Sequence, residues 1–353
     1  MHPLAIAGII AAAIVVAAAV ALFAYRDANL HADERLIAAA HEAGFAEKQL
    51  QVNGAAVNYG EGPDNGPALL LIHGQGMEWE DYAKVLPELA KRYHVFAVDC
   101  FGHGESAHDP ALYTCQAIGD SLIAFAAQAI DGPYLVSGHS SGGILAAYVA
   151  ANDAENVAAC VLEDPPFFSV LPEEVQEGAG AFVWYDGYLP AHDYTSSRPD
   201  TPYAVFYAER SYLFSLFGGL QGKVVEDARA WCAEHPGEHV VTPWVPRDWT
   251  RGMYFMDDFD PAFGDSFYTG SWFEGIDQAQ LLGAIECPTI YLKAETSYGE
   301  DGVLYAANTD EDAARVMELV PSCEMRTIKS GHDIHYENPA FFIAALDDAA
   351  AGI

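Results

Sequence analysis

Ser140 stands at the centre of the run Gly-His-Ser-Ser-Gly at positions 138–142. A serine with glycine two residues away on each side is typical of a sharp turn between a strand and a helix, which lifts the hydroxyl above a sheet. The flanking segments fit this turn, because residues 134–137 have the pattern of a buried strand and residues 141–151 that of a helix. The sequence therefore predicts Ser140 as the nucleophile of an acyl-transfer reaction.

Two histidines near the C-terminus are candidates for the general base that such a serine needs. His332 comes directly after a glycine in the loop beyond a predicted strand at 323–329, and His335 lies slightly further on. We favour His332 as the base and expect His335 to pack or to cap a helix. A zinc site made of His332, Asp333 and His335 is an alternative, but no further ligand group at a suitable spacing supports it. The cysteines also lack the paired spacing of structural zinc sites, so we predict neither a metal nor a cofactor.

Backbone donors for a developing oxyanion are predicted at two turns. The run His-Gly-Gln-Gly at 73–76 follows a continuous apolar segment at 68–72 and can present a backbone N–H. Acyl transfer needs two donors aimed at the place where the tetrahedral oxygen gains charge. We assign these donors to the N–H groups of Gln75 and Ser141, and expect His73 itself to have a structural role.

Apolar runs alternate with helical patterns along the middle of the chain. The runs that indicate strands lie at 68–72, 94–98, 134–137 and 157–162. The helical stretches between them lie at 79–92, 113–130 and 141–151. This alternation predicts an α/β fold with a mostly parallel central sheet and helices on both faces. A helix at 33–48 and a hairpin at 49–59 are expected ahead of it.

The alternation breaks at Pro165, and the segment that follows is rich in aromatic residues, proline and glycine. Strand and helix patterns resume at 288–293, 310–319 and 323–329. The sequence therefore predicts an insertion in the sheet domain. Its aromatic side chains favour an apolar pocket between the insertion and the sheet.

From about residue 49 onward the chain resembles the α/β-hydrolase superfamily, in its lid-bearing branch of serine hydrolases and esterases. The matching motifs each follow a predicted strand, in the family's order: His73-Gly74, the run Asp-Cys-Phe-Gly-His-Gly-Glu-Ser at 99–106, the Ser140 turn and Gly331-His332. The resemblance implies a catalytic triad in the chain order serine, acid, histidine. It also implies a cap inserted after the sixth strand, where the break at Pro165 falls.

The acid of the triad stays open at this point. The resemblance places it in a loop past the seventh strand, where the usual count from Pro288 reaches Ser297 rather than a carboxylate. We favour Asp164, which follows the sixth strand and precedes a rigid diproline, over Asp301. Two further carboxylates in the same region remain candidates, namely Glu295 and Glu300.

The N-terminus is strongly apolar, since residues 4–25 contain no charged side chain. A helix of this length would extend about 33 Å at about 1.5 Å per residue, enough to cross the hydrocarbon core of a membrane. A single-pass anchor is the first interpretation. A cleaved signal peptide is the rival, although no lysine or arginine precedes the apolar stretch. The side of the membrane stays open, because acidic neighbours offset Arg26 and Arg35.

These patterns and the resemblance together divide the chain. Residues 1–30 are expected to form the membrane anchor or an uncleaved signal, and residues 31–48 a linker helix. The α/β-hydrolase core is expected at 49–164 and 285–353. A mainly helical cap is expected at 165–284, between the two parts of the core.

Composition and motifs together limit the function. The chain has 51 acidic against 16 basic residues, a formal charge of −35, which repels phosphate backbones and excludes nucleic acid as a partner. We predict hydrolysis of carboxylic esters with an apolar acyl or alcohol part, through an acyl-enzyme. The alternatives are amide, thioester or carbon–carbon bonds on the same triad, or a non-catalytic, membrane-tethered binding module of the same fold.

Overall fold

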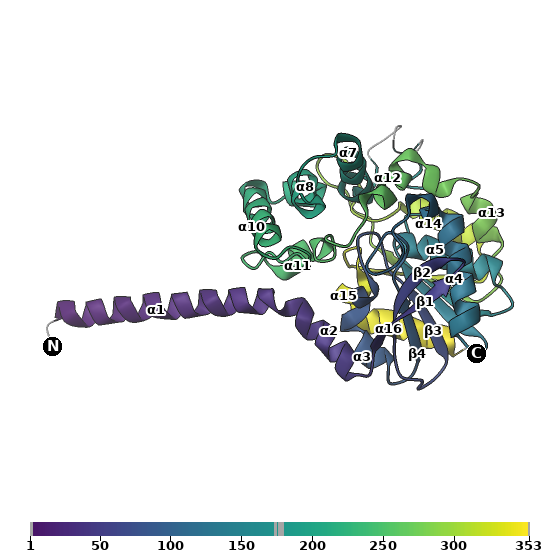
Figure 1. Cartoon of the computed structure of the whole chain (residues 1–353), viewed down its shortest axis with the longest axis horizontal. Helices are drawn as coiled ribbons and strands as arrows, with labels where there is room; N and C mark the ends of the chain where they lie inside the picture. Colours follow the sequence, from purple (N-terminus) through teal and green to yellow (C-terminus); the bar gives the residue numbers. More distant parts are fainter. Residues whose placement is uncertain (1–2, 173–174, 176–179, 352–353) are drawn as a thin grey trace.

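An eight-stranded sheet forms the centre of the computed structural model, which describes residues 3–172, 175 and 180–351 (Figure 1). The strand order is β1-β2-β4-β3-β5-β6-β7-β8. β2 pairs antiparallel with β1 and β4, and the other neighbouring pairs are parallel. The strands are β1 (Ala46–Val52), β2 (Ala55–Glu61), β3 (Ala68–Ile72), β4 (His94–Val98), β5 (Tyr134–His139), β6 (Val157–Glu163), β7 (Thr289–Ala294) and β8 (Cys323–Ile328). The mostly parallel sheet predicted from the alternating pattern is confirmed.

The register of the central strands brings the loops after them together. Every residue of β3 and β5 is buried, as expected for parallel strands that are covered on both faces. Ile72 of β3 lies beside Val98 of β4 and Gly138 of β5. His139 lies beside Glu163 of β6. The carboxyl ends of these strands therefore meet at one edge of the sheet, the usual place for a ligand site in such folds.

Helices cover both faces of the sheet, and alternate residues of β3 face the two layers. Leu70 and Ile72 belong to a hydrophobic cluster with α4 (Cys115–Ala129), α5 (Ser141–Asn152) and α14 (Asp310–Leu319). Leu69 and Leu71 belong to a second cluster, formed with η1 (Trp79–Lys84), α3 (Leu86–Leu89) and α16 (Pro339–Ala350). The side chains of a strand alternate between faces, so a continuous apolar run is what both layers require.

The helix predicted at 33–48 is shorter than expected. It is α2 (Ala32–Glu42), and Gly44 beyond it adopts a φ of 103°, which ends the helix before β1 begins. The hairpin predicted at 49–59 is correspondingly longer and comprises β1 and β2. Its turn lies at Asn53 and Gly54, with φ values of 52° and 88°.

The single helix predicted at 79–92 is wrong, because the chain forms η1 and α3 in its place. Pro87 lies in the first turn of α3. In one continuous helix its ring would collide with the carbonyl of Ala83, and it has no N–H to donate to that carbonyl. A helix can begin at this proline but cannot run through it.

The segment between β6 and β7 forms a helical cap, as predicted, and the cap is drawn above the core in Figure 1. Among its helices are η3 (Trp184–Tyr188), α7 (Leu189–Ser197), α8 (Tyr203–Arg210), α9 (Tyr212–Ser215), η4 (Gly218–Leu220), α10 (Gln221–Glu234), α11 (Arg247–Thr250), η5 (Arg251–Met253), α12 (Pro261–Thr269), η6 (Ser271–Phe273) and α13 (Gln278–Gly283). Aromatic rings form its interior. Phe267 stacks on Trp272 and on Tyr188, with ring centroids 4.2 and 4.5 Å apart.

The apolar N-terminus forms α1 (Pro3–Leu30), which extends away from the rest of the molecule (Figure 1). Its stretch Ile9–Leu30 is long and apolar enough to cross a membrane, and none of that stretch is buried against the protein. The base of the helix contacts the cap. Asn29 Nδ2 donates to the carbonyl oxygens of Pro243 and Val245 at 3.2 and 3.1 Å. Just beyond α1, Asp33 forms a buried ion pair with Arg247 of the cap.

Candidate active site

Ser140 occupies a strained turn between β5 and α5. Its φ of 55° and ψ of −123° lie outside the regions that residues with a side chain favour. The turn requires both flanking glycines, since a β-carbon at Gly138 would collide with the carbonyl of Gly142, and one at Gly142 with the carbonyl of His73. The Ser140 N–H donates to the carbonyl oxygen of Glu163 in β6 at 2.9 Å. The neighbouring strand thus holds the turn in place.

The loop after β3 lies directly against Ser140. A β-carbon at Gly74 would be 2.9 Å from Nδ1 of His139 and 3.1 Å from the Ser140 Cβ, so a side chain there would force its neighbours to move. The backbone N–H groups of Gln75 and Ser141 donate to none of the residues that the structure describes. Free donors beside Ser140 are the arrangement that an oxyanion requires.

Two buried histidines fix that loop. His73 Nδ1 donates to the Gly74 carbonyl at 2.7 Å, and its Nε2 accepts from the Cys100 N–H at 3.0 Å. Burial lowers the pKa of His73 to about 4, so the ring is neutral and can accept. His103 Nε2 accepts from the Gly76 N–H at 3.0 Å in the same manner. The structural role expected for His73 fits these contacts, and the similar role of His103 was missed.

His332 meets Asp164 at the carboxyl edge of the sheet. The Nδ1 of His332 lies 2.7 Å from Oδ2 of Asp164, whose Oδ1 accepts from the Ala294 N–H at 3.0 Å. Asp164 is completely buried. The buried Nε2 of His332 has no hydrogen-bond partner among the described residues. A neutral ring with its proton on Nδ1 would therefore carry a free lone pair on Nε2.

The surroundings of His332 shift its pKa. Burial by itself lowers the pKa, but the hydrogen bond and the negative charge of Asp164 outweigh burial and raise the pKa above 6.5. Asp333 and Glu163 add to this rise. His332 consequently holds a proton more strongly than an ordinary histidine, as suits a base that must become an imidazolium during a reaction.

The other acid candidates lie elsewhere. Asp301 accepts from the Tyr212 hydroxyl at 2.9 Å and from the Val303 N–H at 3.1 Å, and its side chain is exposed. Glu295 and Glu300 are also exposed in the loop after β7. Of the four carboxylates considered, Asp164 is the one that the fold brings to His332.

A cavity of about 340 Å³ lies between the core and the cap. Ser140, His332 and the loop at 74–77 form its floor. Its walls come largely from apolar side chains of the cap: Phe182, Val183, Tyr188, Tyr203, Tyr207, Leu213, Phe214, Trp249, Met256 and Phe259. The predicted apolar pocket between insertion and sheet is therefore present, with Ser140 and His332 both in its lining.

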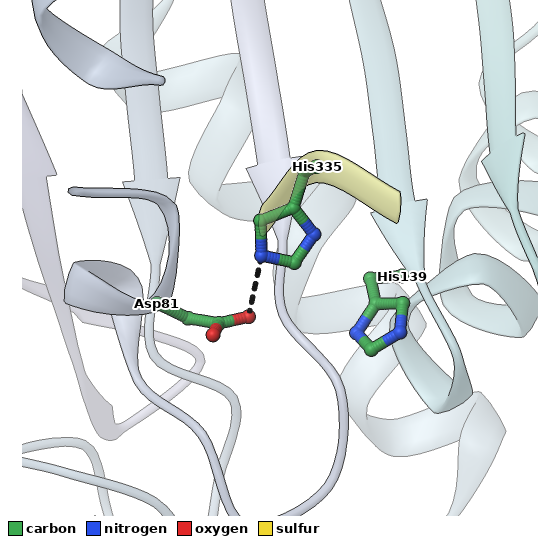
Figure 2. A group of neighbouring side chains, drawn as sticks. All are labelled: Asp81, His139 and His335. Atoms are coloured by element: carbon green, nitrogen blue, oxygen red, sulfur yellow. Dashed lines mark ion pairs between the residues drawn. The ribbon is translucent and has the colours of Figure 1, made fainter. Parts of the chain in front are cut away.

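A buried polar network lies behind His332, and the sequence did not suggest it. His335 on α15 (Ile334–Glu337) contacts Glu163 through Nδ1 at 2.9 Å and Asp81 through Nε2 at 3.2 Å, the pair marked in Figure 2. Arg251 of the cap forms ion pairs with Asp81 and with Asp333, the latter at 2.6 Å. One cap residue thus contacts both the core and the residue next to His332.

Asp81, His139 and His335 lie as close together as metal ligands would, with one potential ligand atom of each within 4.8 Å of the others (Figure 2). The guanidinium of Arg251 already pairs with Asp81 and lies 3.4 Å from Nε2 of His335. A divalent cation here would face a buried positive charge at close range. We therefore assign these residues to an ion-pair network. The alternative zinc set fits no better, since His332 and Asp333 face different partners.

Comparison with known proteins agrees with this fold. A family model described as "Alpha/beta hydrolase family" matches residues 69–345. N-formylmaleamate deformylase of Pseudomonas putida is 26% identical over 301 residues, covering 85% of this chain and 94% of that protein. Lipase LipV of Mycobacterium tuberculosis is 39% identical over 107 residues, covering 30% of this chain and 39% of the lipase. The crystal structure of a membrane phospholipase A shares the fold, with a TM-score of 0.59, 22% identity and 97% of each chain covered. Because this family model matches more than half of the length of the chain, the chain belongs to the alpha/beta hydrolase family.

Proposed function

We propose that this enzyme is a serine hydrolase that cleaves uncharged carboxylic esters with an apolar acyl or alcohol part. The observation that carries the proposal is the shared cavity, in which Ser140 and His332 line one apolar chamber. His332 contacts Asp164 through Nδ1 and leaves Nε2 without a partner among the described residues. These three side chains have the types and the order that an acyl-enzyme mechanism uses.

In the proposed reaction, Ser140 Oγ attacks the ester carbonyl carbon while His332 Nε2 takes the hydroxyl proton. The N–H groups of Gln75 and Ser141 donate to the oxyanion of the tetrahedral intermediate. His332 then gives its proton to the departing alkoxide, which leaves as the alcohol. A water molecule attacks the acyl-enzyme with His332 again as base, releasing the carboxylic acid and restoring Ser140. Asp164 holds the tautomer with the proton on Nδ1 and stabilises the imidazolium.

The charges around the cavity support an uncharged substrate. Arg251 is the only lysine or arginine among the described residues that line it, and its guanidinium is paired with Asp81 and Asp333. Acidic side chains also line the cavity, among them Asp248 and Glu337. A substrate carboxylate would lose its hydration there without gaining a cationic partner, which is unfavourable.

Amide cleavage is a second candidate, favoured by the similarity over 85% of the chain to N-formylmaleamate deformylase. The same groups would serve, with His332 protonating the departing nitrogen. Maleamate carries a carboxylate, however, and the only cavity-lining lysine or arginine among the described residues, Arg251, is already neutralised. We therefore place ester cleavage first.

An active-site phosphonate tests the nucleophile directly. Full-length wild-type protein in detergent is expected to be labelled at Ser140, and the Ser140→Ala variant to take up no label. Ser137→Ala is the matched control, because this buried hydroxyl in β5 has no hydrogen-bond partner among the described residues and its loss should leave labelling intact. Labelling is read by intact-protein mass spectrometry. An unlabelled wild type, or equal labelling of Ser140→Ala, contradicts the proposal.

Substrate charge is tested with two esters of equal chain length, one ending in a methyl group and one in a carboxylate. We expect kcat/KM to be at least about tenfold higher for the uncharged ester, because about 1.4 kcal/mol of unpaired charge burial suffices for that ratio. The rates are compared at low ionic strength and again at high salt. A preference for the carboxylate would place a free cation in the cavity and favour the deformylase-like candidate.

A further inference from the structure

We propose that the cap carries a second membrane contact, an apolar cap surface made of Leu216, Leu220, Trp244 and Trp249, which sets the cavity mouth against the bilayer. The occupant is a lipid bilayer, and the substrate class is an uncharged ester that resides in it. The proposal rests on the proposed function, since it requires the enzyme to be an esterase, and it further requires α1 to be a membrane anchor.

Among the described residues of the cap, four large apolar side chains are exposed, namely Leu216, Leu220, Trp244 and Trp249. Outside α1, just two other large apolar side chains in the described part of the chain are comparably exposed, Tyr298 and Met325. The ring of Phe217 lies 5.0 Å from that of Trp249, so the segment at 216–220 is next to α11. The exposed fractions are 52% for Leu216, 56% for Leu220, 36% for Trp244 and 51% for Trp249. Trp244 lies five residues before Trp249 in the same segment, so we infer that these exposed side chains face the same side of the cap.

Contacts with the C-terminal end of α1 place the apolar cap surface at the level where α1 would leave the membrane. Arg26 is the first charged residue after the apolar stretch at 4–25, and its guanidinium lies 5.6 Å from the ring centroid of Trp244. The hydrogen bonds of Asn29 to the backbone on both sides of Trp244 hold the two segments together. Figure 1 shows α11 near the C-terminal end of α1, where Asn29 contacts the segment just before α11. Tryptophan is enriched where a membrane meets water, and Trp244 lies where α1 would leave the hydrocarbon.

The cap surface also leads to the catalytic cavity. Trp249 is half exposed and at the same time lines the cavity, together with Leu213 and Phe214 of α9. An acyl chain that leaves the bilayer at this surface would therefore meet apolar side chains as it enters. This arrangement spares an apolar substrate from crossing water before it reaches Ser140.

Charge favours a bilayer over a second copy of the chain as the occupant. Each chain carries a formal charge of −35, so two copies repel one another. A bilayer of zwitterionic lipid imposes no such repulsion. A zwitterionic bilayer can therefore bury the exposed tryptophans and leucines of the cap next to an anchor that is already inserted.

Tryptophan fluorescence locates the surface in the intact protein. Full-length protein is reconstituted in phosphatidylcholine vesicles whose acyl chains carry bromine, a contact quencher. α1 contains no tryptophan, so quenching reports on the rest of the chain. We expect clear quenching in wild type and loss of most of it in Trp244→Phe/Trp249→Phe. The matched control Trp184→Phe/Trp272→Phe, which alters two buried tryptophans, should be quenched like wild type.

Activity provides the second measurement. The triple variant Leu216→Ser/Leu220→Ser/Trp244→Ser changes exposed side chains outside the cavity lining. We expect its rate on a long-chain ester embedded in vesicles to fall at least tenfold relative to its rate on a water-soluble short-chain ester. The control Met325→Ser, an exposed apolar residue on β8, should keep the wild-type ratio.

The possible failures are distinguishable. A wild type that does not hydrolyse the soluble ester contradicts the proposed function, and release of wild type from membranes by alkaline carbonate contradicts the anchor. An unchanged ratio in the triple variant together with unchanged quenching in the double variant overturns the cap surface. A triple variant that changes from dimer to monomer without loss of vesicle activity would assign the surface to a second copy, which also overturns the proposal.

Discussion

The Asp164→Asn variant is expected to hydrolyse esters with a kcat about 10²–10⁴-fold below that of wild type. Asp164 accepts from Nδ1 of His332 at 2.7 Å. The amide of the variant can turn its NH₂ group toward Nδ1 of His332 and so favour the tautomer whose proton is on Nε2. A protonated Nε2 cannot accept the proton of Ser140. Steady-state kinetics should locate the loss in kcat, because Asp164 is completely buried and lies outside the cavity lining.

The pH profile separates this role from a merely structural one. His332 acts as a base only when it is neutral, and its pKa is raised above 6.5, so kcat/KM of wild type should fall as the pH drops through that raised pKa. In Asp164→Asn burial still lowers the pKa but the carboxylate no longer raises it, so the fall should move to lower pH. Asp301→Asn is the matched control and should retain the wild-type rate and profile. Equal, mild losses in both variants would show that neither aspartate is the acid.

The turn at Ser140 could be predicted because its determinants are local. Gly138 is required by a collision with the carbonyl of Gly142 four residues along the chain, whereas Gly142 is required by the backbone of His73 beside it. Any chain that makes this turn in a parallel sheet must meet both demands, so the short motif records them. The strand and helix patterns are local in the same sense. The error at Pro87 was also avoidable, since a proline inside a predicted helix marks a boundary.

The acid proposed for the triad could not be identified from local sequence patterns. Its placement depends on β6 lying beside β7, which brings the N–H of Ala294 to Asp164 across 130 residues of chain. A count along the loop after β7 points instead to Ser297, where no carboxylate stands. The cap lies between these two strands in sequence but not in space, so spacing alone carries no information about the pairing.

Arg251 is the clearest case of a residue that sequence reasoning cannot find. Its partners Asp81 and Asp333 lie 170 and 82 residues away, on opposite sides of it in the chain. No motif surrounds it, and the composition of the cap suggests only an apolar wall. Its importance comes from burial, because a charge removed from water must be paired. Burial also opposes the ionisation of Asp333, yet the Arg251 guanidinium holds the pKa of this carboxyl well below its usual range.

Replacing Arg251 by methionine should therefore destabilise the fold by about 3–5 kcal/mol, since it leaves the buried carboxylate of Asp81 without its main partner. Arg229→Met is the matched control, because this exposed cap arginine pairs with Glu209 at 2.7 Å and should contribute less than about 1 kcal/mol. Both are measured by urea unfolding in detergent.

Adding Asp81→Asn to Arg251→Met removes the unpaired buried charge, so the double variant should recover part of the stability that Arg251→Met alone loses.

The same two single variants and their combination also test whether Arg251 contributes to catalysis. Arg251 contacts Asp333, the neighbour of His332, whereas Asp81→Asn leaves that contact in place. A lower kcat in both variants that contain Arg251→Met, but not in Asp81→Asn alone, would show that the cap arginine positions the loop of His332. Full recovery of stability without recovery of kcat would separate the ion pair of Arg251 with Asp81 from its effect on the loop of His332. Additive losses in stability would show that Arg251 and Asp81 do not stabilise the fold as a buried ion pair.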